Sequence, residues 1–126
     1  KKLLRLKKSM MENGVRYNKG KAKWSLVPFS ALEGMVKVLE FGAEKYSIHN
    51  WKKGLPYTEV CESLMRHLFS FLEGEDTDNE SGLYHKDHIL ANALFLSWLI
   101  ENKPELDNRD VENNLSNKPV LYGHGE

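Results

Sequence analysis

Apolar residues recur at helical spacing in three stretches of the chain, about residues 30–46, 58–74 and 83–101. An acidic loop punctuated by glycine separates the second stretch from the third. The residues before the first stretch are polar and broken by glycine, and the residues after the third are rich in Asn, Asp and Glu. The pattern predicts an all-α fold: a small helical bundle of three to four main helices, with an irregular N-terminal loop and a flexible C-terminal tail.

The first helical stretch has a start signal and one apolar face. Ser30 and Glu33 follow Pro28 with the spacing of a capping box, in which both side chains satisfy free backbone N–H groups. The apolar residues behind this box share one stripe: Leu32, Met35, Val36, Leu39 and Ala43. We therefore expect this helix to pack on the others through one face.

Polar residues interrupt the apolar faces of the other two helices. The second helix is expected to begin near a capping Thr58. His67 lies on its inward side, and Arg66 lies on the adjoining polar stripe. Its inward apolar residues are predicted to be Val60, Leu64, Leu68 and Phe71. The third helix is apolar nearly all round, as is typical of a helix buried in the monomer or against a second subunit. Its exceptions lie in register at i, i+3 and i+7: His85, His88 and Asn92.

Three polar residues on one stripe of a buried helix need partners. Burying such groups unpaired costs several kcal/mol, so each must be hydrogen-bonded, bound to a metal or facing a ligand. A satisfied structural histidine explains any one of them alone. Their shared register, opposite His67 and Arg66, favours a site.

The loop between the second and third helices holds closely spaced carboxylates, among them Glu75, Asp78 and Glu80. Carboxylate oxygens are the ligands that Mg²⁺ and Mn²⁺ take in nucleotide-phosphate sites. The opening of this loop resembles that of a calcium loop, but the later glycine and the distal glutamate of that motif are absent. A solvated turn with charges at the helix ends is the structural alternative.

Two loops combine cations with aromatic or amide groups, a composition that suits a phosphorylated planar ligand. The first holds Arg16 and Lys21 near Tyr17 and Trp24. The second follows the first helix and holds Lys45, Tyr46, Asn50, Trp51 and Lys53. Alternatively, the first is a solvated basic loop, and Trp51 covers the edge of the core in the second.

Composition narrows the class of protein. With eighteen basic and eighteen acidic residues the formal charge is zero, so no net electrostatic field favours nucleic acid or a membrane. We therefore expect the protein to bind neither. One cysteine and no apolar run near ~20 residues predict a cytoplasmic location. The length predicts one helical domain over residues 14–102, between a basic N-terminal tail (1–13) and a polar C-terminal tail (103–126).

The ordered motifs RY-x-x-GK, GA-x-KY, NW-x-KG, RHL and GE-x-x-D-x-ESG-x-x-H-x-x-H-x-x-x-N run through residues 16–92. Together they resemble the phage and bacterial family of dATP/dGTP diphosphohydrolase N-terminal domains, over roughly residues 14–102. The resemblance implies a purine nucleotide ligand and an all-α fold related to the MazG-type nucleotide pyrophosphohydrolases, which hold Mg²⁺ with carboxylates on neighbouring helices.

The chain departs from that wider group in one of the two helices that carry the metal ligands. Glu59 and Glu62 offer the Glu-x-x-Glu of one helix, but His85 and His88 stand where the other helix carries Glu-x-x-Asp. The resemblance therefore supports a nucleotide ligand better than it supports catalysis by this chain.

The first hypothesis is a pyrophosphohydrolase that converts dATP- or dGTP-type triphosphates to monophosphate and pyrophosphate with Mg²⁺ or Mn²⁺. Its catalytic residues are predicted to be His67, Glu75, Asp78, His85 and His88, and its metal ligands Glu75, Asp78, Glu80 and His88. Ligand contacts are predicted for Arg16, Lys21, Lys45, Tyr46, Asn50, Trp51, Lys53, Arg66 and Asn92. We also expect a homo-oligomer, because so small a domain exposes part of an apolar helix.

Two alternatives stay open. One is a non-catalytic protein that sequesters a signalling nucleotide, as a phage counter-defence protein does, or regulates a partner. The other is a structural helical module whose polar stripe only fixes the register of its helices.

Overall fold

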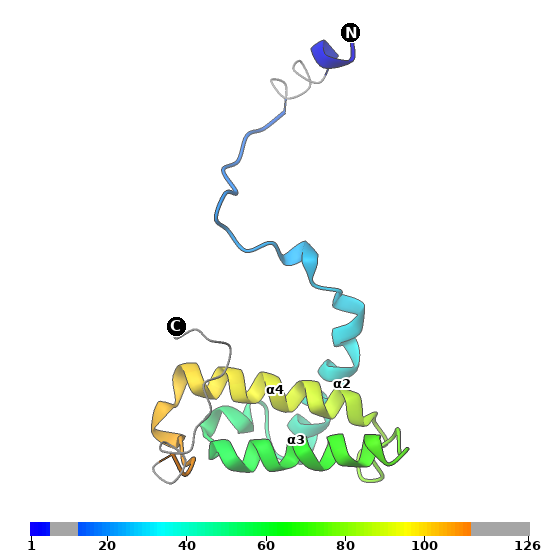
Figure 1. Ribbon diagram of the computed structural model, residues 1–126, viewed down its shortest axis with the longest axis vertical. Helices are drawn as coiled ribbons and strands as arrows, with labels where there is room; N and C mark the ends of the chain where they lie inside the picture. The colour runs from blue at the N-terminus through cyan, green and yellow to red at the C-terminus, as the bar shows by residue number, and fades with distance from the viewer. Residues whose placement is uncertain (6–12, 112–126) are drawn as a thin grey trace.

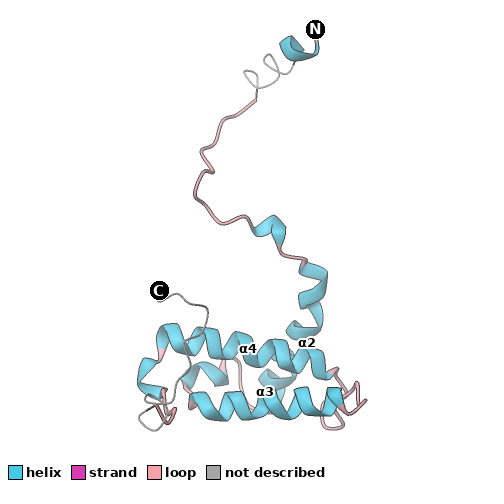
Figure 2. Cartoon of the chain, viewed as in Figure 1, coloured by secondary structure: helices cyan, strands magenta, loops and turns pink. Residues whose placement is uncertain are grey.

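The computed structural model describes residues 1–5 and 13–111 and is built from helices (Figures 1 and 2). Three main helices, α2 (Glu33–Lys45), α3 (Tyr57–Leu72) and α4 (His85–Asn102), lie together. Short 3-10 turns connect or flank them: η1 (Trp24–Leu26), η2 (Phe29–Leu32), η3 (Asn50–Lys53) and η4 (Pro104–Leu106). The described residues form no strand, only an isolated antiparallel bridge between Thr77 and Tyr84. The predicted all-α bundle is confirmed.

The N-terminal loop is irregular, as predicted, and runs away from the three helices (Figure 1). Part of the predicted basic tail and residues 112–126 of the predicted C-terminal tail lie outside the described residues. The described residues that follow α4 contact the helices: Leu106 packs against the core and Asn108 bonds to Thr58. No helix in the described ranges is long and apolar enough to cross a membrane.

Both predicted helix starts are wrong in detail. Residues 29–32 already form a 3-10 turn, so Ser30 lies inside a turn, and α2 begins after Leu32 without a side-chain cap. In α3, Pro56 precedes the first helical residue and Thr58 lies within the helix. The backbone N–H of Thr58 instead donates to Asn108 Oδ1 at 3.1 Å. A distant segment thus supplies the acceptor that the sequence pattern assigned to a local cap.

The densest part of the core joins the beginning of α3 to the end of α4. Tyr57, Val60 and Leu99 are buried there, with Leu55, Phe95, Leu96, Trp98 and Leu106 packed around them. The Tyr57 hydroxyl lies 3.3 Å from the carbonyl oxygen of Leu99 and 3.1 Å from that of Lys103. The Leu99 carbonyl also accepts from the backbone N–H of Lys103, the residue that follows α4, so the hydroxyl ties the start of α3 to the C-terminal end of α4.

The apolar pattern gave the wrong inward face for part of α3, whereas the polar stripe predicted for α4 is buried. Leu68 and Phe71 are 36% and 46% exposed, although Val60 is buried as predicted. Most of the buried residues of α4 are polar, namely His85, Asp87, His88 and Asn92, whereas Leu94 and Ile100 are accessible. On α2, Val38 is buried and Val36 of the predicted stripe is exposed. With three helices, each apolar surface has too few neighbours to cover it.

Contact between α2 and α4 depends on a glycine. The carboxyl group of Asp87, itself buried, lies against Gly34 so closely that a Cβ atom at residue 34 would overlap it. Gly42, on the same helix, has open space where its Cβ would be.

Replacing Gly34 with Ala is expected to lower the free energy of unfolding by about 1–3 kcal/mol, because the new methyl group overpacks a buried contact. Gly42→Ala is the matched control and should raise it by about 0.5–1 kcal/mol through helix propensity. Urea-induced unfolding followed by circular dichroism measures both. Equal changes for the two variants would contradict the proposed close packing at Gly34.

Candidate functional site

Three histidine rings meet where α3 faces the first turns of α4. The Nδ1 atoms of His67 and His85 are 2.8 Å apart. The rings of His67 and His88 stack, with centroids 4.3 Å apart and 4° between their planes. The polar stripe of α4 therefore faces His67 of α3, as its register predicts.

The loop between α3 and α4 is held in a fixed shape beside these rings. The Asp78 N–H donates to the Leu83 carbonyl and the Gly82 N–H to the Asp78 carbonyl, both at 2.8 Å. Gly82 has a φ of 72°, a backbone conformation that glycine adopts without strain. The backbone N–H of Ser81 donates to Asp78 Oδ2 at 2.9 Å, and its hydroxyl lies 3.0 Å from the same oxygen. The Asp78 carboxylate is thereby aimed at the histidines.

Hydrogen bonds select the nitrogen atom that carries the proton on His85. Its Nε2 lies 2.7 Å from Glu75 Oε1, and an ionised carboxylate only accepts hydrogen bonds. Nε2 therefore carries a proton and donates to Glu75, while Nδ1 of His85 faces Nδ1 of His67. A carboxylate that fixes the tautomer of a histidine in this way is the usual support for a metal-binding imidazole.

Three groups of this cluster could hold a metal ion: His67, Asp78 and His85 offer donor atoms that all lie within 4.8 Å of one another. Two imidazole nitrogens and one carboxylate oxygen form a donor set that suits transition ions, while Mg²⁺ prefers oxygen ligands alone. Of the predicted metal ligands, only Asp78 belongs to this group. Glu75 hydrogen-bonds to His85, Glu80 pairs with Lys45, and His88 Nε2 lies 2.7 Å from the Ser81 hydroxyl.

The protonation states of the cluster are those that metal binding requires. Burial lowers the pKa of His67, and the charge of His88 lowers it further. Burial also lowers the pKa of His88, although the Asp78 carboxylate opposes this shift. For Asp78 itself, burial acts to raise the pKa, but the two hydrogen bonds from Ser81 and the nearby imidazoles outweigh it and the pKa falls. At neutral pH His67 and His88 are neutral and Asp78 is ionised.

The cluster lies in a cavity of about 540 Å³ between α2, α3 and the loop. Lys45 of α2 and Arg66 of α3 also line it, and Lys45 forms an ion pair with Glu80 across the cavity. The hydrogen bond to Glu80 raises the pKa of Lys45. Of the predicted site residues, the cavity brings together Lys45, Tyr46, Arg66, His67, Glu75, Asp78, Glu80, His85, His88 and Asn92.

Asn92 is buried, and its Nδ2 donates to the carbonyl oxygen of His88 one turn earlier at 2.9 Å. The apolar side of the cavity is formed by residues that the sequence analysis did not assign to a site, Val38, Phe41 and Phe95. Helical spacing could have predicted two of them as cavity residues, because Val38 and Phe41 lie on the same face of α2 as Lys45. The hydroxyl of Ser81 was also missed, since only the folded loop brings it to His88.

Five predicted ligand contacts lie elsewhere. Trp51 packs at the edge of the core, with its ring centroid 4.7 Å from that of Phe95 and 5.2 Å from that of Trp98. Asn50 and Lys53 belong to η3 with Trp51, and none of the three lines the cavity. Arg16 and Lys21 are exposed in the N-terminal loop. The fold alone does not bring these residues to the histidines.

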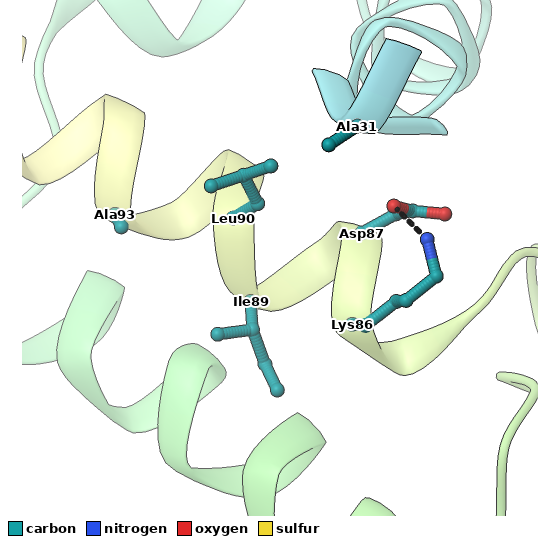
Figure 3. Close-up of a pocket in the computed structure, with 6 residues that line it drawn as sticks. All are labelled: Ala31, Lys86, Asp87, Ile89, Leu90 and Ala93. Atoms are coloured by element: carbon teal, nitrogen blue, oxygen red, sulfur yellow. Dashed lines mark hydrogen bonds and ion pairs between the residues drawn. The ribbon is translucent and has the colours of Figure 1, made fainter. Parts of the chain in front are cut away.

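A second cavity, of about 500 Å³, lies between η2 and the first half of α4 (Figure 3). It is lined mainly by apolar side chains: Ala31, Ile89, Leu90 and Ala93. Its two charged residues, Lys86 and Asp87, pair with each other at 2.9 Å. This cavity offers no free polar group for chemistry, so the histidine cavity is the candidate functional site.

Comparison with known proteins gives two matches. A family model described as "dATP/dGTP diphosphohydrolase, N-terminal" matches residues 11–109. A protein of Salmonella phage PMBT28 described as "dATP/dGTP diphosphohydrolase" is 33% identical over 96 residues, which are 76% of this chain and 33% of the relative. The chain thus spans about a third of the length of that relative. No solved structure matches the chain.

The matched region contains the histidines, the acidic loop and the cationic residues of the cavity. The resemblance drawn from the motifs is therefore confirmed, and the chain belongs to the family of dATP/dGTP diphosphohydrolase N-terminal domains.

Proposed function

We propose that this chain binds a purine deoxynucleoside triphosphate in the histidine cavity and hydrolyses it to the monophosphate and pyrophosphate with a divalent metal ion. The observation that carries the proposal is the meeting of a candidate metal group, His67, Asp78 and His85, with the cations Lys45 and Arg66 in one cavity. Family membership supports a dATP- or dGTP-type substrate. The proposed location is the cytoplasm of a bacterium or a phage-infected host.

His67, Asp78 and His85 are the proposed metal ligands, and Glu75 orients His85. When bound, the ion would neutralise phosphate charge and polarise the phosphoryl oxygens. The donor set favours Mn²⁺ over Mg²⁺ because two of its three atoms are imidazole nitrogens.

The other lining residues would bind and orient the nucleotide. Arg66 presents a planar fork that suits phosphate oxygens, and Lys45 can exchange its contact with Glu80 for a phosphate. Phe41 and Tyr46 would stack on the base, and Asn92 offers an amide to its polar edge.

His88 is the proposed proton acceptor, since its lowered pKa leaves the ring neutral at neutral pH. Water adds to the α-phosphorus, and its proton passes to His88 at Nδ1, because Nε2 donates to the Ser81 hydroxyl, whose own proton bonds to Asp78. The bond from this phosphorus to the oxygen that bridges to the β-phosphorus breaks, and pyrophosphate leaves with the electron pair of that bond.

A second candidate function is nucleotide binding without hydrolysis, either to sequester the nucleotide or to regulate a partner. It is favoured by the chain spanning a third of its phage relative, whose remaining residues offer room for a separate catalytic module. The same cavity would then hold the nucleotide intact.

Metal binding is expected to depend on both the ligands and their support. In Mn²⁺ titrations followed by electron paramagnetic resonance, His85→Ala should abolish tight binding, and Glu75→Gln should weaken it about 10-fold or more by freeing the His85 ring. His49→Asn is the control, because His49 lies outside the cavity and Asn tolerates its left-handed backbone. Unchanged affinity in His85→Ala would refute this metal site.

The metal-free protein is expected to lose stability in acid. The folded-state pKa values of His67 and His88 are lowered, so below about pH 6.5 the unfolded chain takes up protons that the folded chain does not. The free energy of unfolding, measured with urea in the presence of a chelator, should fall from about pH 7.5 to about pH 5.5. The slope should be smaller in His88→Gln, and a slope equal to that of the unchanged protein would contradict the assigned protonation states.

The reaction is tested by incubating the full chain with Mn²⁺ or Mg²⁺ and a panel of deoxynucleoside triphosphates, with products separated by ion exchange. We expect pyrophosphate and monophosphate from dATP or dGTP, a kcat at least about 100-fold lower in His88→Gln, and a raised KM in Arg66→Ala. Lys37→Ala, outside the cavity, should match the unchanged protein. Tight binding with the nucleotide recovered intact would reject hydrolysis and leave the second candidate.

A further inference from the structure

The side of α3 that faces away from the histidines is apolar. Met65, Leu68, Phe69 and Leu72 recur at i, i+3, i+4 and i+7, the spacing of a helix face built to be covered. We call these four residues the outer stripe. All four are exposed, Phe69 to 56% and Leu72 to 69%. Adjacent apolar side chains of this size on a small domain mark an interaction surface.

Carboxylates border the outer stripe where α3 ends. Glu73 follows Leu72 directly, and Glu75, Asp76, Asp78 and Glu80 follow in the loop, with no basic residue between them. Glu75, Asp78 and Glu80 also line the histidine cavity. Glu73 and Asp76 are exposed, and neither carboxylate forms an ion pair within the described part of the chain. The uncovered apolar surface is thus continuous with an acidic one at the cavity rim.

The N-terminal loop has the opposite character. Residues 13–29, which we call the arm, contain Arg16, Lys19, Lys21 and Lys23 and no acidic residue. Large apolar side chains alternate with these cations and are exposed, Tyr17 to 86% and Trp24 to 69%, as are Val15, Leu26 and Phe29. The arm runs away from the helices to which it is joined (Figure 1).

We propose that the arm of one copy docks on the outer stripe and the acidic end of α3 in a second copy. The apolar side chains of the arm would cover the stripe, and its four cations would face the carboxylates from Glu73 to Glu80. Two such contacts, one from each arm, form a closed dimer with the same surface on both subunits.

Charge distinguishes this arrangement from direct pairing of two outer stripes. Antiparallel pairing of α3 with its copy would bring the acidic end of each helix toward Glu59 and Glu62 of the other, and parallel pairing would bring the two acidic ends together. The one arginine of α3, Arg66, lies in the cavity lining. The arm, in contrast, combines cations with exposed apolar side chains and no acidic residue, so its charge complements this surface.

The surface involved is large enough for a stable dimer. Four stripe residues and five apolar arm residues take part in each contact. If each side chain loses on the order of 70 Å² of accessible surface, the two contacts bury about 1,300 Å², which falls within the ~1,200–2,000 Å² of stable interfaces.

Docking carries Arg16 and Lys21 to the cavity rim of the second copy, where Glu75 and Glu80 lie. A site completed between two subunits accounts for these two predicted ligand contacts lying far from the cavity of their own chain. Only this role in the site rests on the proposed function; the docking itself does not.

Complementary charge reversal tests the docking. One variant of the full chain carries Lys19→Glu and Lys23→Glu in the arm, and the other carries Glu73→Lys and Asp76→Lys. Neither pair belongs to the cavity lining, and a lysine at residue 73 suits the C-terminal end of α3. Masses are measured by light scattering after size exclusion over a range of concentrations. Lys37→Glu with Lys103→Glu controls for the change in charge.

We expect a dimer for the unchanged and control proteins and a monomer for each reversed variant alone. An equimolar mixture of the two variants should return to the dimer, because each reversed arm then meets a reversed acidic end. Phe69→Ser, at an exposed position, should also be monomeric. A monomer for the unchanged chain at all concentrations, as expected if the arm folds back on its own helices or covers another part of a longer protein, would overturn the proposal.

Dimeric reversed variants, or variants that stay monomeric when mixed, would also overturn it. The readout is mass, so it is independent of nucleotide chemistry. A dimer that binds no deoxynucleotide would reject the proposed function and leave the docking in place, and a monomer that binds deoxynucleotide would do the reverse.

Discussion

Burial of the polar first half of α4 is the constraint on which the rest of this structure depends. His85, Asp87, His88 and Asn92 are all buried, in a helix whose apolar Leu94 and Ile100 are partly exposed. Each buried polar group needs a partner in a medium where an unpaired one is costly. The partners come from three directions: Glu75 and Ser81 from the loop, His67 from α3, and Lys86 beside Asp87. The fold around α4 is the arrangement that supplies them together.

This constraint also gives the cluster its chemical character. Burial keeps His67 and His88 neutral, while the hydrogen bonds from Ser81 keep Asp78 ionised despite its partial burial. Glu75, about half exposed, fixes the proton of His85 on the nitrogen that faces away from His67. Two imidazole rings and one carboxylate thereby place possible ligand atoms within 4.8 Å of one another. Such a preorganised set of donors suits a cation and the phosphates that accompany it.

The same three-helix design leaves the outside of the molecule incomplete. Since the inward side of α3 is occupied by Val60 and His67, no helix among residues 1–5 and 13–111 covers the apolar residues on its other side. The arm carries aromatic and aliphatic side chains that are equally uncovered. A small domain that places polar groups inside must find apolar burial elsewhere, and contact between copies is one way to obtain it.

The sequence by itself determined the helix content, the three main helices to within about three residues and the polar register of α4, because helical periodicity is a local property of the chain. It also located the acidic loop, and its ordered motifs placed the chain in its family. Only the tertiary structure decided the helix starts, since Asn108, fifty residues away, bonds to the first turn of α3. It likewise decided that Trp51 packs on Phe95 and Trp98, that Glu75 supports His85, and that Ser81 joins Asp78 to His88. These are contacts between segments whose separation in space no local pattern encodes.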